Sequence, residues 1–164
     1  MLWKPALTTQ PLATATIRLS GPEAAEALGA RIARCLAPGD AILLWGDLGA
    51  GKSTLARGLI RAATGDPSLD VPSPTFTIVQ TYDAPGMTVW HFDLYRLDGP
   101  EDLQEIGMEE ADDGVAVIEW PERLGDRLAA DRLDIALEIS PEGRIARISA
   151  WGPSWRDRFD DIAG

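Results

Sequence analysis

Eight consecutive residues in the first third of the chain have the types and spacing needed to hold a phosphate group. The run from Gly46 to Ser53, GDLGAGKS, fits the pattern G-x-x-x-x-G-K-[ST] at every required position. Its glycines let the backbone curl closely around an anion, so that N–H groups and the positive end of a following helix point at it. The lysine reaches the terminal phosphates, and the serine hydroxyl is a ligand for bridging Mg²⁺. The motif predicts binding of a magnesium nucleotide through Asp47, Leu48, Gly49, Ala50, Gly51, Lys52, Ser53 and Thr54.

The segments on either side of this loop predict the strand and the helix that the motif requires. Ala41 to Trp45 is a short apolar run that follows a Pro-Gly turn, which is typical of a buried strand. Thr54 to Ala63 carries apolar residues at helical spacing, and Gly65 is placed to end the helix. The loop is therefore predicted to join a central strand to a helix N-terminus.

Two further strands are predicted to end in a carboxylate. Val115 to Ile118 is fully apolar and is followed by Glu119, and the run from Met87 ends at Asp93. Parallel strands bring such groups to their carboxyl ends, beside a phosphate loop. Glu119 is thus predicted to contact Mg²⁺. Asp93 is interpreted either as the group that orients a water molecule or as a helix cap or a partner of Arg96.

His91 is the only histidine in the chain, and two-residue alternation places it on the same strand face as Asp93. A single histidine on a strand is more often packed or hydrogen-bonded than catalytic. The sequence offers no serine or cysteine nucleophile partner for it. We therefore expect His91 to be packed or hydrogen-bonded rather than catalytic.

Composition and charge narrow the class of protein. The 164 residues are 45% hydrophobic and 25% charged, which is ordinary for one globular domain. No apolar run reaches membrane-spanning length, and no secretory signal is recognisable. The single Cys35 cannot form an internal disulfide, which favours a reducing cytoplasm, and we expect its thiol to be packed rather than nucleophilic. The net charge of -11 disfavours direct binding of nucleic acid, whereas a basic protein partner is compatible with it.

The pattern along the whole chain predicts one α/β domain over residues 1–164, with an irregular lead-in over 1–14 and a short helix or tail over 151–164. Ser20 to Glu23 reads as a capping box that opens a helix running to Leu36. An acidic helix is expected between Asp98 and Asp113. The remaining predicted strands are 15–19 and 76–82, with a terminal hairpin of 133–139 and 144–150. The expected fold is a P-loop NTPase-like three-layer α/β/α sandwich with a mixed, largely parallel sheet.

Four blocks in order carry a more specific resemblance. They are the loop with its following Thr54, then Ser73-Pro74-Thr75-Phe76, then the block HFDLYRL from His91 to Leu97, and finally Glu119-Trp120-Pro121. Together they resemble the signature of the TsaE (YjeE) family, and the likeness extends from about Ile17 to Ala150. The phosphate loop alone is not specific to one family, whereas the third block, HFDLYRL, and the fourth, Glu119-Trp120-Pro121, are.

The resemblance implies a function and residue roles. Members of that family are small bacterial ATPases required for threonylcarbamoyladenosine at position 37 of tRNA, and they dock on the TsaB–TsaD pair. ATP hydrolysis resets that complex, while the partners hold the tRNA. By matching position, Lys52 and Ser53 would hold the phosphates of ATP and Mg²⁺, Glu119 would hold Mg²⁺, and Asp93 would support hydrolysis. Ser73, Pro74 and Thr75 would form a nucleotide-sensitive switch loop, and Trp120 would lie next to the site.

Other nucleotide-binding functions give weaker matches. A small-molecule kinase would use Arg123, Arg127 and Arg132 as a phosphate-neutralising lid, although these arginines read as the solvated side of a short helix. A GTPase is disfavoured because no Asn-Lys-x-Asp motif follows the D-x-x-G at Asp83. A non-hydrolysing, ATP-dependent adaptor remains an alternative. No arginine finger is recognisable, so slow turnover alone and faster turnover with a partner are expected.

Overall fold

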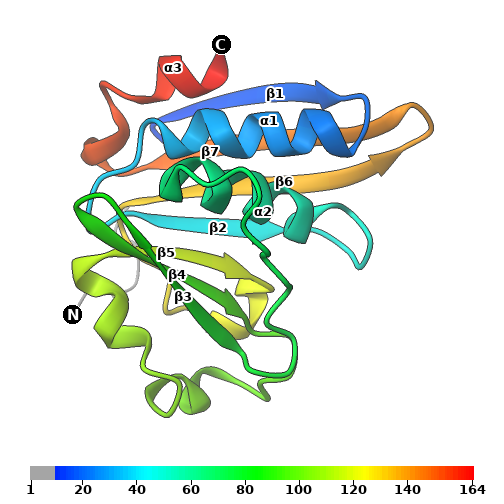
Figure 1. Cartoon of the computed structure of the whole chain (residues 1–164). Helices are drawn as coiled ribbons and strands as arrows, with labels where there is room; N and C mark the ends of the chain where they lie inside the picture. Colours follow the sequence, from blue (N-terminus) through cyan, green and yellow to red (C-terminus); the bar gives the residue numbers. More distant parts are fainter. Residues whose placement is uncertain (1–9) are drawn as a thin grey trace.

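The computed structural model describes residues 10–164 and contains a mixed seven-stranded sheet (Figure 1). The strand order is β1-β7-β6-β2-β5-β4-β3. The four central strands β6, β2, β5 and β4 are parallel, whereas β1, β7 and β3 pair antiparallel with their neighbours. The strands are β1 Ala13–Leu19, β2 Ala41–Trp45, β3 Val79–Ala84, β4 Met87–Asp93, β5 Val115–Glu119, β6 Arg132–Ser140 and β7 Gly143–Trp151.

Two different layers cover the faces of this sheet. One layer consists of α1 (Pro22–Ala33), α2 (Lys52–Thr64) and α3 (Phe159–Ala163). The opposite face is covered by the short 3-10 helices η1 (Pro100–Gln104), η2 (Met108–Asp113) and η3 (Pro121–Leu124). The predicted α/β fold with a largely parallel sheet and a C-terminal hairpin is confirmed, with 3-10 helices as the second covering layer.

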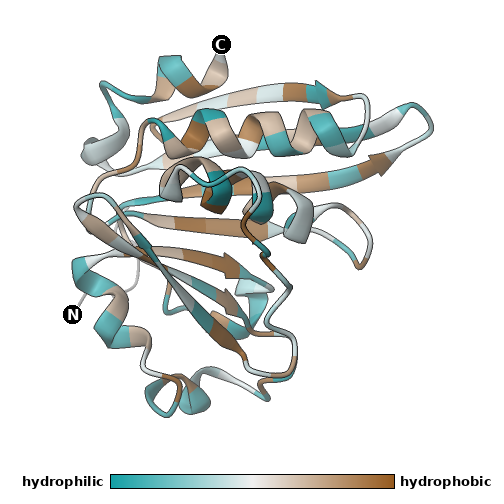
Figure 2. Ribbon diagram, in the orientation of Figure 1, coloured by the Kyte–Doolittle hydropathy of each residue, from teal (hydrophilic) through white to brown (hydrophobic). Residues whose placement is uncertain are grey.

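The central strands alternate between the two covering layers. In β5, Val115 and Val117 pack in the core on the α side, whereas Ala116 and Ile118 pack against the 3-10 layer. β2 is hydrophobic along its length, and β5 is hydrophobic up to Glu119, because both faces of these two strands are buried (Figure 2). The same alternation places the side chain of Glu119 on the α side, where α2 begins.

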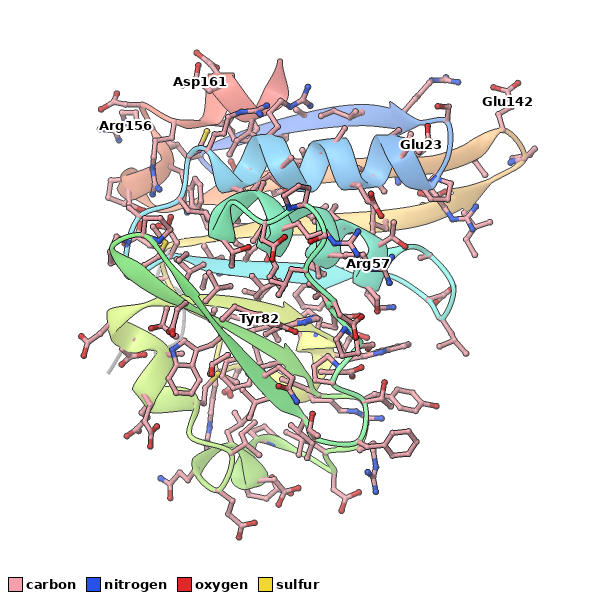
Figure 3. The ribbon with its side chains drawn as sticks, in the orientation of Figure 1. Glu23, Arg57, Tyr82, Glu142, Arg156 and Asp161 are labelled. Carbon is pink, nitrogen blue, oxygen red and sulfur yellow. The ribbon has the colours of Figure 1, made fainter. Side chains whose placement is uncertain are left out.

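Glycines allow α1 and α2 to touch backbone to backbone. A Cβ atom on Gly58 would lie 2.2 Å from the carbonyl oxygen of Glu26, and one on Gly29 would lie 2.3 Å from that of Leu55. Arg57, labelled in Figure 3, pairs with Glu26 across the same contact at 3.7 Å. This close contact fixes the position of α2, and with it the phosphate loop.

The predicted capping box before α1 does not form. Gly21 is the N-cap, and its carbonyl oxygen accepts the first helical N–H groups, so Ser20 lies one residue too early. Pro22 occupies the first turn as predicted. The helix ends at Ala33 rather than Leu36, because the N–H groups of Cys35 and Leu36 bond three residues back and tighten the last turn.

Two other predicted elements have different bounds or types. β3 begins at Val79 rather than Phe76, because Ile78 has a φ of 70° and turns the chain out of the sheet. The single acidic helix expected between Asp98 and Asp113 is instead η1 and η2, separated by Gly107 with a φ of 75°. β1 begins at Ala13 within the predicted lead-in, and the rest of that prediction, residues 1–9, lies outside the described part of the chain.

The C-terminal region consists of the β6–β7 hairpin and a segment after it that packs on the α-side core. The hairpin of β6 and β7 is slightly longer than predicted, and Glu142 lies at its tip (Figure 3). Residues 153–155 form η4, and Trp155, Phe159 and Ile162 are buried in the α-side core. None of the helices within residues 10–164 has the length and apolar character needed to cross a bilayer.

Candidate functional site

The phosphate loop lies between the end of β2 and the start of α2, as predicted from the sequence. Gly51 is the N-cap of α2 in the left-handed region, with a φ of 108°. Gly46 also needs to be glycine, because its φ is 144° and a Cβ atom there would lie 2.6 Å from a carbonyl oxygen of β6. The first N–H groups of a helix have no partner within that helix, and here they border the loop. The local geometry is that of an anion-binding helix N-terminus.

A cleft of about 330 Å³ opens beside this loop, at the carboxyl edge of the parallel strands. Its size is that of a small-molecule site. Among the predicted residues, Asp47 and Ala50 line a separate hollow toward β6, and Pro74 lines neither. The lining residues of the cleft are Leu48, Gly49, Gly51, Lys52, Ser53, Thr54, Ser73, Thr75, Asp93, Tyr95, Glu119 and Trp120.

Lys52 begins α2 and is buried at the base of the loop. Its ammonium donates to the carbonyl oxygens of Gly46 and, at 3.0 Å, of Asp47. The same nitrogen lies 3.9 Å from the ring centroid of Trp120. Burial lowers the pKa of Lys52 below its ordinary value, while nearby carboxylates, Glu119 first among them, oppose this shift. The cation is thus held at the loop by weak neutral acceptors that a phosphate group would outcompete.

Glu119 connects the start of α2 to the strands. Its Oε1 accepts a hydrogen bond from the Ser53 hydroxyl at 2.8 Å, and its Oε2 lies 2.6 Å from Nε2 of His91. Both Glu119 and His91 are almost completely buried. A hydroxyl and a carboxylate side by side are oxygen donors of the kind that Mg²⁺ prefers.

Asp93 ends β4 next to Glu119, with which it pairs in register across the parallel strands. Its Oδ2 accepts hydrogen bonds from Ser73 at 3.1 Å and Thr75 at 3.2 Å, and its Oδ1 accepts the N–H of Tyr95 at 3.0 Å. The carboxylate therefore caps the turn after β4 and holds the segment from Ser73 to Thr75. The alternative ion pair with Arg96 does not form between these described residues. The Arg96 guanidinium lies over the ring of Phe76 instead, 5.5 Å from its centroid.

Comparison with known proteins identifies the family. The family model described as "Threonylcarbamoyl adenosine biosynthesis protein TsaE" matches residues 19–147. The chain belongs to the TsaE family. The resemblance inferred from the four sequence blocks is thereby confirmed, and TsaE proteins take part in the biosynthesis of threonylcarbamoyladenosine.

Individual TsaE proteins match over most of their length. A protein of Rickettsia felis named "tRNA threonylcarbamoyladenosine biosynthesis protein TsaE" is 39% identical over 127 residues, which are 77% of this chain and 74% of that protein. A protein of the same name from Bacillus subtilis is 33% identical over 74% of this chain and 75% of its own. The crystal structure of Bacillus subtilis YdiB superposes with a TM-score of 0.75 at 28% identity, covering 92% of this chain and 95% of that one.

Two residues of this TsaE protein have an unusual backbone conformation: Trp120, which lines the cleft, and Ile78, whose carbonyl oxygen accepts the N–H of Asp93 at 2.8 Å. Within residues 10–164, Ile78 and Trp120 are the only residues other than glycine with positive φ, at 70° and 60°. Such conformations cost on the order of 1–3 kcal/mol each and cluster at functional sites. Ile78 turns the segment of Ser73 and Thr75 toward Asp93. Trp120 brings its ring onto Lys52 and within 5.0 Å of the Tyr95 ring.

The arginines considered for a kinase lid have other partners. Arg132 is buried in β6, where it pairs with Asp134 at 3.2 Å, so its predicted place on a solvated helix face was wrong. Arg127 donates to the carbonyl oxygen of Pro100 at 3.2 Å, and Arg123 donates to that of Tyr95 at 3.4 Å. None of the three lines the cleft.

The sequence analysis missed the contact between His91 and Glu119. Alternation placed His91 and Asp93 on one face, but the pairing that puts β4 beside β5 is a tertiary feature. It also missed Tyr95, whose N–H and aromatic ring both contact predicted site residues. The HFDLYRL block contains both residues, so a closer reading of that block could have included them.

Proposed function

We propose that this protein is a Mg²⁺-dependent ATPase that acts on the TsaB–TsaD complex in the cytoplasm, in support of threonylcarbamoyladenosine formation at position 37 of tRNA. One observation carries the proposal. The cation and hydroxyl at the start of α2, Lys52 and Ser53, face the carboxylates of Asp93 and Glu119 in one cleft of about 330 Å³. The whole chain, residues 1–164, would then be one P-loop ATPase domain.

The donor set fits a magnesium nucleotide. The N-terminus of α2 and the glycine loop would bind the phosphates through backbone N–H groups. Ser53 and Glu119, whose oxygens lie 2.8 Å apart, would hold Mg²⁺. The metal, when bound, supplies positive charge that neutralises the phosphate oxygens. Lys52 would exchange the carbonyl oxygens of Gly46 and Asp47 for phosphate oxygens.

Asp93 would orient the water molecule that attacks the γ-phosphorus atom in line, with cleavage of the bond to the β-phosphate bridging oxygen. Its Oδ2 is held by the hydroxyls of Ser73 and Thr75. Movement of this segment, which includes Pro74, would free Oδ2 to accept a hydrogen bond from the water. Ser73 to Thr75 would thus act as a switch loop, and Lys52 would stabilise the charge that develops on the phosphoryl group.

The proposed partner dependence rests on two observations. No arginine lines the cleft among the residues that the structure describes, so these residues supply only Lys52 as a cation to stabilise the transition state. The net charge of -11 also leaves contact with tRNA to the partners. We therefore expect slow hydrolysis by the free protein and faster hydrolysis in the complex.

The deciding experiment measures phosphate release from ATP by the purified chain, alone and with the TsaB–TsaD pair from the same source. Lys52→Ala provides the blank, because loss of the ammonium should abolish tight ATP binding. Glu119→Ala should lower turnover and weaken its dependence on Mg²⁺. Stimulation by the pair is the expected result. Binding of ATP without hydrolysis in any mixture would refute the ATPase and favour an adaptor, whereas transfer to an added small molecule would favour a kinase.

A further inference from the structure

His91 is a buried polar residue without a role in the function proposed above. Its side chain is 1% exposed on β4, between the parallel strand β5 and the antiparallel strand β3. Burying an imidazole is costly unless its nitrogen atoms are hydrogen-bonded, so an apolar residue would fill this position at lower cost. The contacts of its two nitrogen atoms therefore indicate why a histidine stands here.

Among residues 10–164, the ring has one polar contact, and it is with the proposed magnesium ligand. Nε2 lies 2.6 Å from Oε2 of Glu119, while Nδ1 has no hydrogen-bond partner among residues 10–164. Because an ionised carboxylate can only accept hydrogen bonds, we assign Nε2 as the donor in this contact. With the proton assigned to Nε2, Nδ1 carries a lone pair that has no partner among residues 10–164.

The contact completes the fixation of the Glu119 carboxylate. Oε1 accepts from Ser53 of α2 and Oε2 accepts from His91 of β4, so each oxygen is held by a different element. If the Ser53 hydroxyl turns to a metal ion, His91 remains as the anchor that determines which way the carboxylate points. Hydrogen bonds to metal-ligating carboxylates have this orienting effect, and their loss costs about 10–100-fold in metal affinity or activity.

We infer that His91 is a positioning residue that acts through Glu119, holding its carboxylate in the orientation that binds Mg²⁺ with the nucleotide. This inference rests on the proposed function for the identity of the metal and the nucleotide. It assigns a role to a residue that the sequence predicted to be packed or hydrogen-bonded rather than catalytic. The role requires a donor at the position of Nε2, and it does not require a change of charge on the ring.

Two amide substitutions at position 91 distinguish the loss of the hydrogen bond that orients Glu119 from the mere burial of a different polar group. The Gln side chain places an N–H group near the position of Nε2, whereas the shorter Asn amide does not reach Glu119. His91→Gln and His91→Asn therefore bury similar polar groups but differ in the contact that matters. Thermal unfolding of both variants is measured first.

The first measurement is binding of ADP by isothermal titration calorimetry at increasing Mg²⁺ and in EDTA. We expect His91→Asn to raise the half-saturating Mg²⁺ concentration about 10–100-fold and to leave the affinity for ADP in EDTA unchanged. His91→Gln keeps a donor, so its half-saturating Mg²⁺ concentration should stay close to that of the unsubstituted protein. In a Glu119→Gln background, His91→Asn should add no further loss. Unchanged Mg²⁺ dependence in His91→Asn, equal loss in both variants, or additive loss with Glu119→Gln would each overturn the inference.

The second measurement needs no substitution at His91. Because the chain has a single histidine, ¹⁵N labelling of histidine gives one imidazole spectrum. Replacing Glu119 with Gln, and adding Mg²⁺ with ADP, should each shift the Nε2 resonance. An Nε2 signal that is insensitive to Glu119→Gln refutes the contact itself. If the unsubstituted protein shows no Mg²⁺-dependent ADP binding, the proposed function fails, and this resonance still tests the pairing.

Discussion

The contact between α1 and α2 predicts that Gly58→Ala destabilises the protein, although alanine is the better helix former. The added Cβ atom would lie 2.2 Å from the carbonyl oxygen of Glu26 and 2.5 Å from its Cα. Both are backbone atoms of a helix, so no side-chain rotation relieves the clash. The two helices would have to separate by about 1 Å, which sacrifices dispersion contacts along their interface.

The magnitude follows from two opposing terms. Overpacking of a close-packed interface costs about 1–3 kcal/mol, and this case belongs at the upper end because the obstacle is backbone. Replacing glycine in a helix interior returns up to about 1 kcal/mol. The expected loss in the free energy of unfolding is therefore about 1–2 kcal/mol, or a fall in Tm of roughly 2–8 °C for a chain of this size.

Thermal unfolding by calorimetry tests this expectation, with controls one residue away. Arg57→Ala and Arg57→Gly both remove the ion pair with Glu26, so the difference between them measures the intrinsic preference for alanine in the same helix. Arg57→Ala should be more stable than Arg57→Gly by the helix preference for alanine. The steric cost of Gly58→Ala is the amount by which its change in free energy of unfolding falls short of that gain. An unchanged or raised Tm for Gly58→Ala would refute the backbone contact and the view that it fixes the phosphate loop.

Three further predictions concern the cleft, the C-terminal element and the thiol. Asp93→Asn should retain Mg²⁺-dependent ATP binding in calorimetry but lower phosphate release at least about 100-fold, as expected for loss of a group that positions the nucleophile; retained hydrolysis would remove Asp93 from the mechanism. Trp155→Ala should lower the free energy of unfolding in urea by about 3–5 kcal/mol, because the indole is fully buried in the α-side core; a loss below 1 kcal/mol would show that the C-terminal segment is not docked. Burial raises the pKa of the Cys35 thiol, with Asp161 adding to the shift, so its thiolate forms only at higher pH than that of free cysteine. Alkylation by iodoacetamide should therefore be slower than that of free cysteine at pH 7 and should reach half its maximum at a higher pH, and equal rates at pH 7 would contradict this.

Local chemistry made the loop between β2 and α2 and its flanking elements predictable from the sequence. The strand Ala41–Trp45 and the glycine that ends α2 follow from apolar runs and turn residues that act over a few positions. Glycines at positions of positive φ can be recognised because few other residues tolerate that conformation. The ordered blocks HFDLYRL and EWP also identified the family, because they are specific in residue type and spacing.

Where the local signal was weak, tertiary contacts decided the outcome. The segment from Phe76 has strand-like alternation, but Ile78 leaves the sheet so that Ser73 and Thr75 reach Asp93. The acidic segment after Asp98 has helical composition, but its apolar side chains bury against the sheet from two short 3-10 helices. Such conformations depend on packing partners far away in the sequence, so local propensity cannot determine them.

The sequence by itself predicted which residues would carry the proposed chemistry, because a cation, a hydroxyl and two carboxylates are recognisable by type and by their place at strand or helix ends. Only the tertiary structure decided how they are joined. The order of the strands places β4 beside β5, and this brings His91 and Asp93 to Glu119. Residue type is a local property of the chain, whereas strand order results from burying both faces of one sheet, and that requires the whole fold.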